Sequence, residues 1–269
     1  MRLGIGSYSY GWAADKSKTG LSRAMSPLNL LYKAVIYGIN VVQIADNMPL
    51  HMLNRVQRAQ LAQAAKERGI SLEVGTRGLT PENMRSYIAI ARELDSVLLR
   101  VVIDAQGYEP SAAGVVSVIR EILPVLKDNN VTLAIENHDR FPVRELRAII
   151  EECASRYVGV CLDSANSLGA GEGIEMAINS LAEYTVNLHV KDFEVKRLPS
   201  LMGFTVQGRP AGQGMLDIPR LIQTVSAFHP DISAILELWT PPEKNIRGTL
   251  HKEERWVKES LAYLRCLIV

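Results

Sequence analysis

Three carboxylates and one imidazole stand in apolar segments of this sequence at regular intervals. Glu136, Asp163 and His189 are separated by 27 and 26 residues, and Glu237 follows His189 by 48. A charged side chain within an apolar strand is costly unless it is paired or bound to a cation. Three neighbouring carboxylates would also repel one another, and a divalent cation removes that repulsion. We therefore interpret the four residues as ligands of one metal ion, Mn²⁺ first, then Mg²⁺, with Co²⁺ or Zn²⁺ as alternatives.

Each of these residues also has a purely structural interpretation when it is taken alone. His189 alone would more often be a hydrogen-bonded core histidine than a ligand. The carboxylates have ready partners: Arg100 for Glu136, the turn at 164–166 for Asp163, and Lys191 for Glu237. The common spacing favours the metal interpretation for the set as a whole.

The spacing of these residues matches one strand followed by one helix, and the rest of the chain repeats that pattern. Short apolar runs alternate with amphipathic stretches, and continuous apolar runs are typical of parallel strands covered on both faces. We predict eight strands, at residues 3–10, 41–46, 71–77, 97–104, 131–137, 158–163, 185–192 and 234–239.

Helix ends are readable between these strands. Ser26 and Thr80 each offer an N-cap followed by a proline, and Gly38 and Gly69 are suited to end helices. Further helices are predicted over 115–125, over 143–153, over 218–228 and from about residue 252 to the C-terminus. We expect the apolar stretch 261–269 to pack on the body of the protein.

Eight strand–helix units in 269 residues predict a single (β/α)8 TIM barrel over residues 1–269. An open doubly wound sheet is the alternative, but no GxGxxG motif follows the first strand. A barrel would bring the four predicted ligands to one mouth, at the C-terminal ends of its strands. The glycine-rich connection 192–217 lies on the same face, and we predict a long irregular loop with a functional role there.

Composition excludes several classes of protein. The net charge of +1 lacks the basic excess of nucleic-acid binders, so we expect no nucleic-acid partner. No signal peptide or membrane span is visible, and we expect a cytoplasmic protein, compatible with a homo-oligomer, with no membrane partner. Cys153, Cys161 and Cys266 form no CxxC pair, and we interpret them as small buried residues.

On these residues the sequence resembles the sugar phosphate isomerase/epimerase family of xylose-isomerase-like barrels. The resemblance covers nearly the whole chain, and its specific parts are IENH at 135–138, LD at 162–163, LHVKDF at 188–193, GQGMLD at 212–217 and LE at 236–237.

The resemblance implies roles for particular residues. Glu136, Asp163, His189 and Glu237 would ligate one divalent ion, usually manganese, and the two glutamates would serve as acid and base. Substrate hydroxyls would contact groups near Lys191 and on the loop after the seventh strand. We add His138, Arg100 and Asn166 as candidate substrate contacts, and Trp239 as an apolar wall or plain core packing. Asn166 departs from the family, which often has a histidine at that position.

We therefore predict a metal-dependent isomerase or epimerase of a small sugar-like hydroxy-ketone. The metal would stabilise an enediolate after one glutamate removes a proton, and the other glutamate would return it. A dehydratase or lyase acting on a keto-acid or a dehydroshikimate-like ring on the same site stays an alternative. A non-catalytic sugar-binding subunit is another. An abasic-site endonuclease is disfavoured, because the chain has only five histidines and balanced charge.

Overall fold

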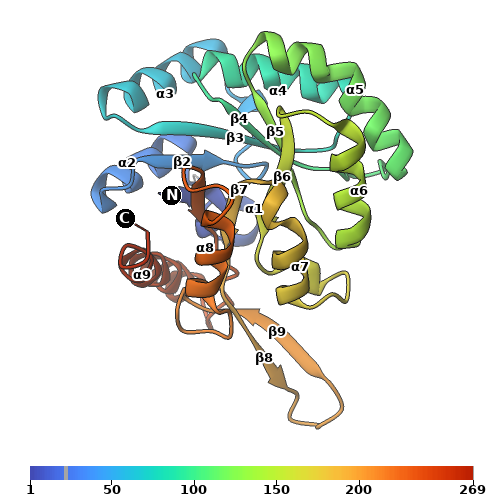
Figure 1. Cartoon of the computed structure of the whole chain (residues 1–269). Helices are drawn as coiled ribbons and strands as arrows, with labels where there is room; N and C mark the ends of the chain where they lie inside the picture. Colours follow the sequence, from blue (N-terminus) through green and yellow to red (C-terminus); the bar gives the residue numbers. More distant parts are fainter. Residues whose placement is uncertain (21–23, 269) are drawn as a thin grey trace.

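The short apolar runs of the sequence form parallel strands that close into a barrel (Figure 1). The computed structural model describes residues 1–20 and 24–268. Around the barrel the strands follow the order β1-β10-β7-β6-β5-β4-β3-β2. Their bounds are β1 Arg2–Gly6, β2 Val41–Ile44, β3 Ser71–Arg77, β4 Leu98–Val102, β5 Thr132–Glu136, β6 Val158–Asp163, β7 Thr185–Val190 and β10 Ser233–Leu236. The predicted (β/α)8 barrel is confirmed.

Helices follow the strands and cover the outside of the barrel (Figure 1). They are α1 Lys16–Thr19, α2 Pro27–Tyr37, α3 Arg55–Glu67, α4 Pro81–Glu93, α5 Ala112–Asp128, α6 Val143–Cys153, α7 Ile174–Leu181, α8 Ile218–Ser226 and α9 Ile246–Leu264. Ser26 and Thr80 cap α2 and α4 through their side chains, as predicted. Within the described part of the chain, no helix is both long and apolar enough to cross a membrane.

Two buried regions of different character make up the interior. The apolar faces of the helices pack on the strands in one extended hydrophobic cluster. Inside the barrel, polar side chains occupy several of the positions that branched apolar residues usually fill, beside a small separate cluster of Leu98, Ala134 and Cys161. The Nε2 atom of Gln43 on β2 donates across the interior to Oδ1 of Asn187 on β7, at 2.9 Å. Buried polar side chains therefore lie in the barrel interior beneath its mouth.

Several predicted element ends were wrong. The first strand was predicted to run to Tyr10, but Ser7–Tyr10 form a 3-10 helix after β1 ends at Gly6. The last helix begins at Ile246 and not near residue 252, because Asn245 caps it by accepting from the backbone N–H of Gly248. Cys266 is exposed, although it was predicted to be buried, whereas Cys153 and Cys161 are buried.

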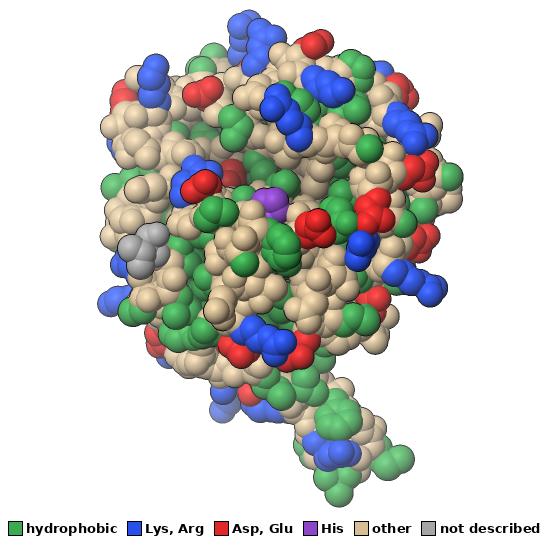
Figure 2. Space-filling model, in the orientation of Figure 1, with side chains coloured by type: hydrophobic (Ala, Val, Ile, Leu, Met, Phe, Trp, Pro, Cys, Tyr) green, Lys and Arg blue, Asp and Glu red, His purple; other side chains and the backbone are tan. Residues whose placement is uncertain are grey.

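The connection after β7 is not the irregular loop that we predicted. Phe193–Arg197 (β8) and Phe204–Gly208 (β9) pair as an antiparallel hairpin that projects from the barrel (Figure 1). Hydrophobic side chains gather at its free end (Figure 2), among them the exposed Leu201, Met202 and Phe204.

The C-terminal stretch packs on the body of the protein, as expected. Leu261, Leu264 and Ile268 are buried in the main hydrophobic cluster. Residue 269 of the predicted stretch lies outside the described residues.

Candidate functional site

Four consecutive strands bring the predicted ligands together. Glu136 and Asp163 are the last residues of β5 and β6, His189 lies in β7, and Glu237 directly follows β10. The register pairs Asp163 with His189, and Ile235, two residues before Glu237, with His189. All four side chains are buried. The expectation that unit spacing places them at one mouth is therefore met.

The ring of His189 lies at the centre of this group. Its Nδ1 atom is 3.5 Å from Oε2 of Glu136, 3.8 Å from Oδ2 of Asp163 and 3.5 Å from Oε1 of Glu237. These distances are too long for good hydrogen bonds. Among the described residues, neither Nδ1 of His189 nor Oε1 of Glu237 has a hydrogen-bond partner. Buried polar atoms without partners are rare, and these face a common point.

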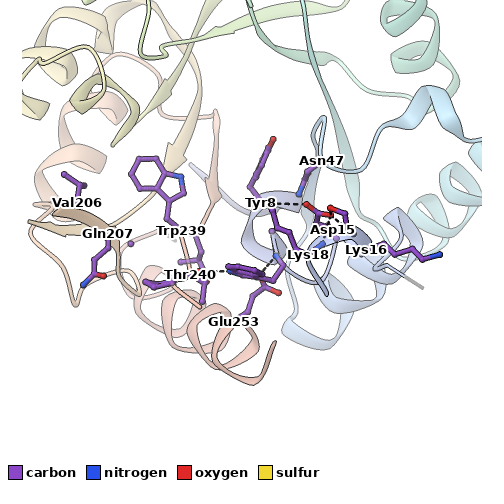
Figure 3. Close-up of a pocket in the computed structure, with 17 residues that line it drawn as sticks. Tyr8, Asp15, Lys16, Lys18, Asn47, Val206, Gln207, Trp239, Thr240 and Glu253 are labelled. Atoms are coloured by element: carbon purple, nitrogen blue, oxygen red, sulfur yellow. Dashed lines mark hydrogen bonds and ion pairs between the residues drawn. The ribbon is translucent and has the colours of Figure 1, made fainter. Parts of the chain in front are cut away.

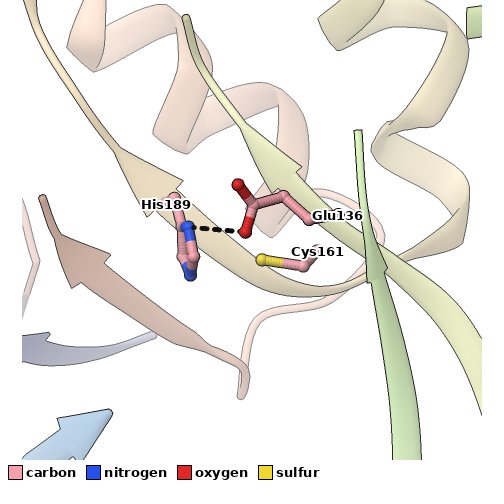
Figure 4. A group of neighbouring side chains, drawn as sticks. All are labelled: Glu136, Cys161 and His189. Carbon is pink, nitrogen blue, oxygen red and sulfur yellow. Dashed lines mark ion pairs between the residues drawn. The ribbon is translucent and has the colours of Figure 1, made fainter. Parts of the chain in front are cut away.

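A sulfur atom lies beside the same ring. Cys161 precedes Asp163 by two residues on β6, so both side chains point to the same face of the strand. Ligand atoms of Glu136, Cys161 and His189 lie within 4.8 Å of one another (Figure 4), and so do those of Asp163, His189 and Glu237. Burial raises the pKa of the Cys161 thiol to about 12, so the thiol carries its proton at neutral pH. The sequence analysis interpreted Cys161 only as a small buried residue and did not place it at the site, although the two-residue period of the strand pointed there.

Each structural partner that the sequence offered is also present. Arg100 donates through Nε to Oε2 of Glu136. Oδ1 of Asp163 accepts from the backbone N–H groups of Ala165 and Asn166, at 2.8 and 2.9 Å. The carboxylate groups that could bind a metal therefore also accept hydrogen bonds from the protein.

Lys191, which directly follows β7, enters the carboxylate cluster. Its Nζ atom lies 2.7 Å from Oδ2 of Asp163 and 3.0 Å from Oε2 of Glu237. It also lies 4.9 Å from the ring centroid of Trp239. Burial alone would lower the pKa of Lys191, but the charges of Asp163 and Glu237 outweigh burial and raise it. The lysine therefore stays charged at the mouth of the barrel.

The pKa values of the carboxyl groups follow from these cations. Burial would raise the pKa of Glu136, but the Arg100 guanidinium, together with His189 and Lys191, holds that pKa below its ordinary value. Burial would likewise raise the pKa of Asp163, but Lys191 and His189 together hold it below its ordinary value. Burial would lower the pKa of His189, yet the surrounding negative charge raises it well above its ordinary value. The cluster therefore has an excess of negative charge that draws a proton, or another cation, to the ring.

The predicted substrate contacts lie around a pocket of about 350 Å³ above the cluster. Arg100, Lys191, His138 and Asn166 all line it, together with Glu136 and Glu237. Asn166 points inward and donates through Nδ2 to Oε1 of Glu136 at 2.7 Å. His138 is half-buried at the rim and pairs with Asp139.

Other pocket residues escaped sequence reasoning. Tyr8 lines the pocket and donates its hydroxyl to Oδ2 of Asp46 at 3.0 Å. Oδ1 of Asp46 accepts from Nη1 of Arg100 at 2.8 Å. Tyr8 was hidden within the over-long first strand. Asp46 ends the second predicted strand, so its position at a strand end was the available signal.

A larger groove of about 800 Å³ adjoins the pocket (Figure 3). Tyr8 and Trp239 line both spaces. The base of the hairpin, at Val206, Gln207 and Gly208, forms one side of the groove. The hairpin therefore helps to shape the approach to the site.

The segment after β7 is held by one buried carboxylate. Oδ2 of Asp192 accepts from the backbone N–H groups of Gly212 and Gly214, both at 2.9 Å. Its Oδ1 accepts from those of Phe193 and Leu216, at 2.8 and 3.1 Å. A Cβ atom at Gly214 would lie 2.1 Å from Oδ1 of Asp192, so the close approach requires glycine there.

Comparison with known proteins agrees with this architecture. A family model described as xylose isomerase-like TIM barrel matches residues 31–267. The chain is 32% identical over 267 residues to 3-oxo-isoapionate decarboxylase of Pectobacterium atrosepticum, covering 98% of this chain and 95% of that protein.

Solved structures share the fold at low sequence identity. D-psicose 3-epimerase from Clostridium cellulolyticum H10, solved with D-tagatose, matches with a TM-score of 0.74 and 17% identity, covering 100% of this chain and 99% of that one. The IOLI protein with a bound zinc atom matches with a TM-score of 0.70 and 14% identity, covering 98% and 99% of the two chains. With its closed parallel barrel and a family match over residues 31–267, this chain belongs to the xylose isomerase-like TIM barrel family.

Proposed function

We propose that this chain is a metal-dependent lyase that removes the carboxyl group of a small 3-oxo sugar acid. This reaction is a lyase reaction, like the alternative that the sequence left open, but it releases CO2, which the sequence did not predict. It replaces the isomerase or epimerase as our first choice. The similarity to 3-oxo-isoapionate decarboxylase, which extends over nearly both full lengths, supports the substrate class.

The observation that carries the proposal is the unequal bonding of the two glutamates. Both carboxylate oxygens of Glu136 accept hydrogen bonds, from Arg100 and Asn166, and its pKa is lowered. Glu237 keeps Oε1 without a hydrogen bond in the described structure. Epimerisation needs two groups that exchange protons with carbon, and a carboxylate held by a guanidinium is a poor proton donor. Decarboxylation needs one proton donor only.

The residues present fit a divalent cation. Oxygen atoms of Glu136, Asp163 and Glu237 and the free Nδ1 of His189 form a donor set suited to Mn²⁺, Mg²⁺ or Zn²⁺. The three carboxylates carry more negative charge than Lys191 and the shared Arg100 neutralise, which a divalent ion would correct. When bound, such an ion supplies Lewis-acid polarisation of the substrate carbonyl.

The protein's own groups then account for the remaining steps. Arg77 and His138 lie at the pocket rim, where their cationic or hydrogen-bonding groups can orient the substrate carboxylate. The bond between the carboxyl carbon and the adjacent carbon breaks, CO2 leaves, and the electron pair moves to the ketone oxygen. Lys191 delivers a proton from Nζ to the carbon that lost the carboxyl group. Trp239 shields that carbon from water.

Isotope labelling tests this proposal directly. The metal-loaded protein is incubated in D2O with 3-oxo-isoapionate carrying ¹³C in its carboxyl group. We expect one equivalent of ¹³CO2 and one deuterium at the carbon that lost the carboxyl group. EDTA-treated protein and the His189→Gln variant serve as controls, and both should be inactive. Turnover without carbon loss, or equal activity after EDTA treatment, would refute the metal-dependent decarboxylation.

A ketose epimerase remains the second candidate, because Glu136 and Glu237 both line one pocket. Its signature is deuterium uptake into D-fructose or D-tagatose beside the ketone, with no carbon lost. Glu136→Gln and Glu237→Gln should then both abolish exchange. The decarboxylase instead predicts no exchange into either sugar by the wild-type protein.

A further inference from the structure

A column of buried polar side chains lies beneath His189, on the side away from the pocket. It consists of Gln43 on β2, Glu73 on β3, Asn187 on β7 and Ser233 on β10, and all are buried. Barrels of this kind usually fill these positions with Val, Ile or Leu, because polar groups there must all find partners. None of these four side chains lines the pocket or the groove above it. Their role is therefore not substrate contact.

Glu73 at the base sets the direction of the hydrogen bonds. Its Oε2 accepts from Nε2 of Gln43 at 3.0 Å and from Nδ2 of Asn187 at 3.1 Å. Its Oε1 accepts from the hydroxyl of Ser233. Oε2 acts as an acceptor whether Glu73 is ionised or carries a proton on Oε1, so the direction does not depend on its protonation state.

The amide of Gln43 is consequently held in one orientation. Its Nε2 faces two acceptors, Oε2 of Glu73 and Oδ1 of Asn187, the latter at 2.9 Å. A flipped amide would place its oxygen against both of these oxygens. The oxygen of Gln43 must therefore point the other way, where it lies 2.7 Å from Nε2 of His189.

An amide oxygen can only accept, so Nε2 of His189 must carry the proton. A cation or a second proton can then bind the ring only at Nδ1, the atom that faces Glu136, Asp163 and Glu237. Metal-binding histidines generally donate their second ring nitrogen to a fixed acceptor, which sets the tautomer and the ring plane.

We propose that Gln43 is the positioning residue of the site: held in one orientation by Glu73 and Asn187, it fixes His189 so that Nδ1 is the nitrogen offered to a cation. The meaning of this arrangement for catalysis rests on the proposed function. The arrangement itself is a property of the protein alone, and it is testable without any metal.

The experiment combines a spectrum of the metal-free protein with a metal titration. Protein with ¹⁵N-labelled histidine rings is used to record ring N–H signals, and the His189 signal is identified as the one absent from His189→Gln. Mn²⁺ affinity is measured separately, from the loss of the free-ion EPR signal. The test variant is Gln43→Met, which keeps the volume but has no amide. Ser233→Ala is the matched control, because it also removes a buried hydrogen bond to Glu73 but leaves the bond between Gln43 and His189 intact.

In the wild-type protein we expect a slowly exchanging proton on Nε2 of His189. In Gln43→Met that proton should exchange at least tenfold faster, and the Mn²⁺ dissociation constant should rise about 10- to 100-fold. Ser233→Ala should leave both quantities unchanged. An unprotonated Nε2 in the wild type, or wild-type exchange and affinity in Gln43→Met, would overturn the inference.

The two proposals fail in different ways. A wild-type protein that binds no Mn²⁺, yet shows the protected Nε2 proton and loses it in Gln43→Met, would refute the metal-dependent function and support the role of Gln43. If Gln43→Met does not fold, the wild-type spectrum still decides, because it reports directly whether Nε2 or only Nδ1 carries the proton.

Discussion

The ammonium nitrogen of Lys191 lies 2.7 Å from Oδ2 of Asp163, so a cation of the chain already engages one of the proposed metal ligands. Its second contact, at 3.0 Å, is with Oε2 of Glu237. The lysine and a bound divalent ion would share these carboxylates. Lys191 would therefore weaken the electrostatic attraction for the metal, while in the proposed reaction it would supply the proton for the reacting carbon.

Lys191→Met separates these two effects. We expect turnover to fall by about 10²- to 10⁴-fold, because the proton donor is lost. Mn²⁺ affinity should rise, because Asp163 and Glu237 no longer share their charge with an ammonium group. Steady-state decarboxylation rates and Mn²⁺ titration measure the two quantities. Lys191→Arg keeps the charge and serves as the control for metal affinity. Wild-type turnover in Lys191→Met would remove the lysine from the mechanism.

Arg100 forms a buried ion pair with Glu136, another proposed metal ligand. Removal of the arginine should destabilise the fold. Arg100→Met leaves Glu136 buried without its guanidinium, and breaking a buried pair in this way costs about 3–5 kcal/mol. Urea unfolding of the metal-free proteins measures the loss. Arg85→Met is the matched control, because Arg85 pairs with Glu121 on the exposed surface and should cost at most about 1 kcal/mol.

The pH dependence of that loss has a definite sign. Because Arg100 lowers the pKa of Glu136, the ionised carboxylate contributes stability above its ordinary pKa, and this stability is lost as the pH falls. The difference between wild type and Arg100→Met should therefore be larger at pH 6 than at pH 3, which lie on the two sides of the ordinary pKa of 4.5. Equal losses in the Arg100 and Arg85 variants would contradict the stabilising role of the buried pair.

The grouping of Glu136, Asp163, His189 and Glu237 could be predicted from the sequence because these residues repeat with the strand–helix unit. A residue at the end of a barrel strand has a fixed level along the barrel axis and fixed neighbours on the adjacent strands, and neither depends on the loops. Gln43 could not be found in this way, since its contact with His189 joins residues 146 positions apart across the interior. Such a contact depends on barrel closure and register, which no local pattern encodes.

The hairpin was missed, although its apolar residues alternate with polar ones as in strands. These apolar residues are Phe193 and Val195 in β8 and Phe204 and Val206 in β9.

Glu253 gives the protein a pH-dependent stability of opposite sign. Burial raises the pKa of Glu253 from 4.5 to about 7, although Trp12 and Ala13 donate backbone N–H groups to it. The folded state therefore binds a proton more tightly than the unfolded state. Its contribution to stability is fully present below about pH 4.5 and is lost as the pH rises through 7, a difference of about 3 kcal/mol.

Glu253→Gln should flatten this dependence. We expect its free energy of unfolding, measured with urea from pH 5 to pH 8, to be lower than wild type at pH 5, because the amide cannot accept from both N–H groups. The deficit should shrink or reverse by pH 8. Glu259→Gln removes a carboxylate from the exposed face of the same helix and should leave the slope unchanged. Parallel curves for Glu253→Gln and wild type would show that Glu253 does not titrate in this range.

Asp192 should control the order of the segment that follows β7. Its two oxygens accept four backbone N–H groups, so Asp192→Asn places an amide nitrogen against two of these donors. Hydrogen bonds to a charged group contribute about 1.5–3 kcal/mol each, and we expect the segment 193–216 to detach from the barrel.

Limited proteolysis should then cut within this segment in the variant well before it cuts in the wild type. Turnover should fall as well, because Gln207 and Gly208 line the groove beside Trp239. Glu194→Gln alters the next acidic residue, whose partners Lys196, Gln207 and Arg209 all lie within the same segment. It does not tie the segment to the barrel and should leave proteolysis unchanged. If Asp192→Asn resists the protease as the wild type does, other contacts hold the hairpin and the carboxylate is not its anchor.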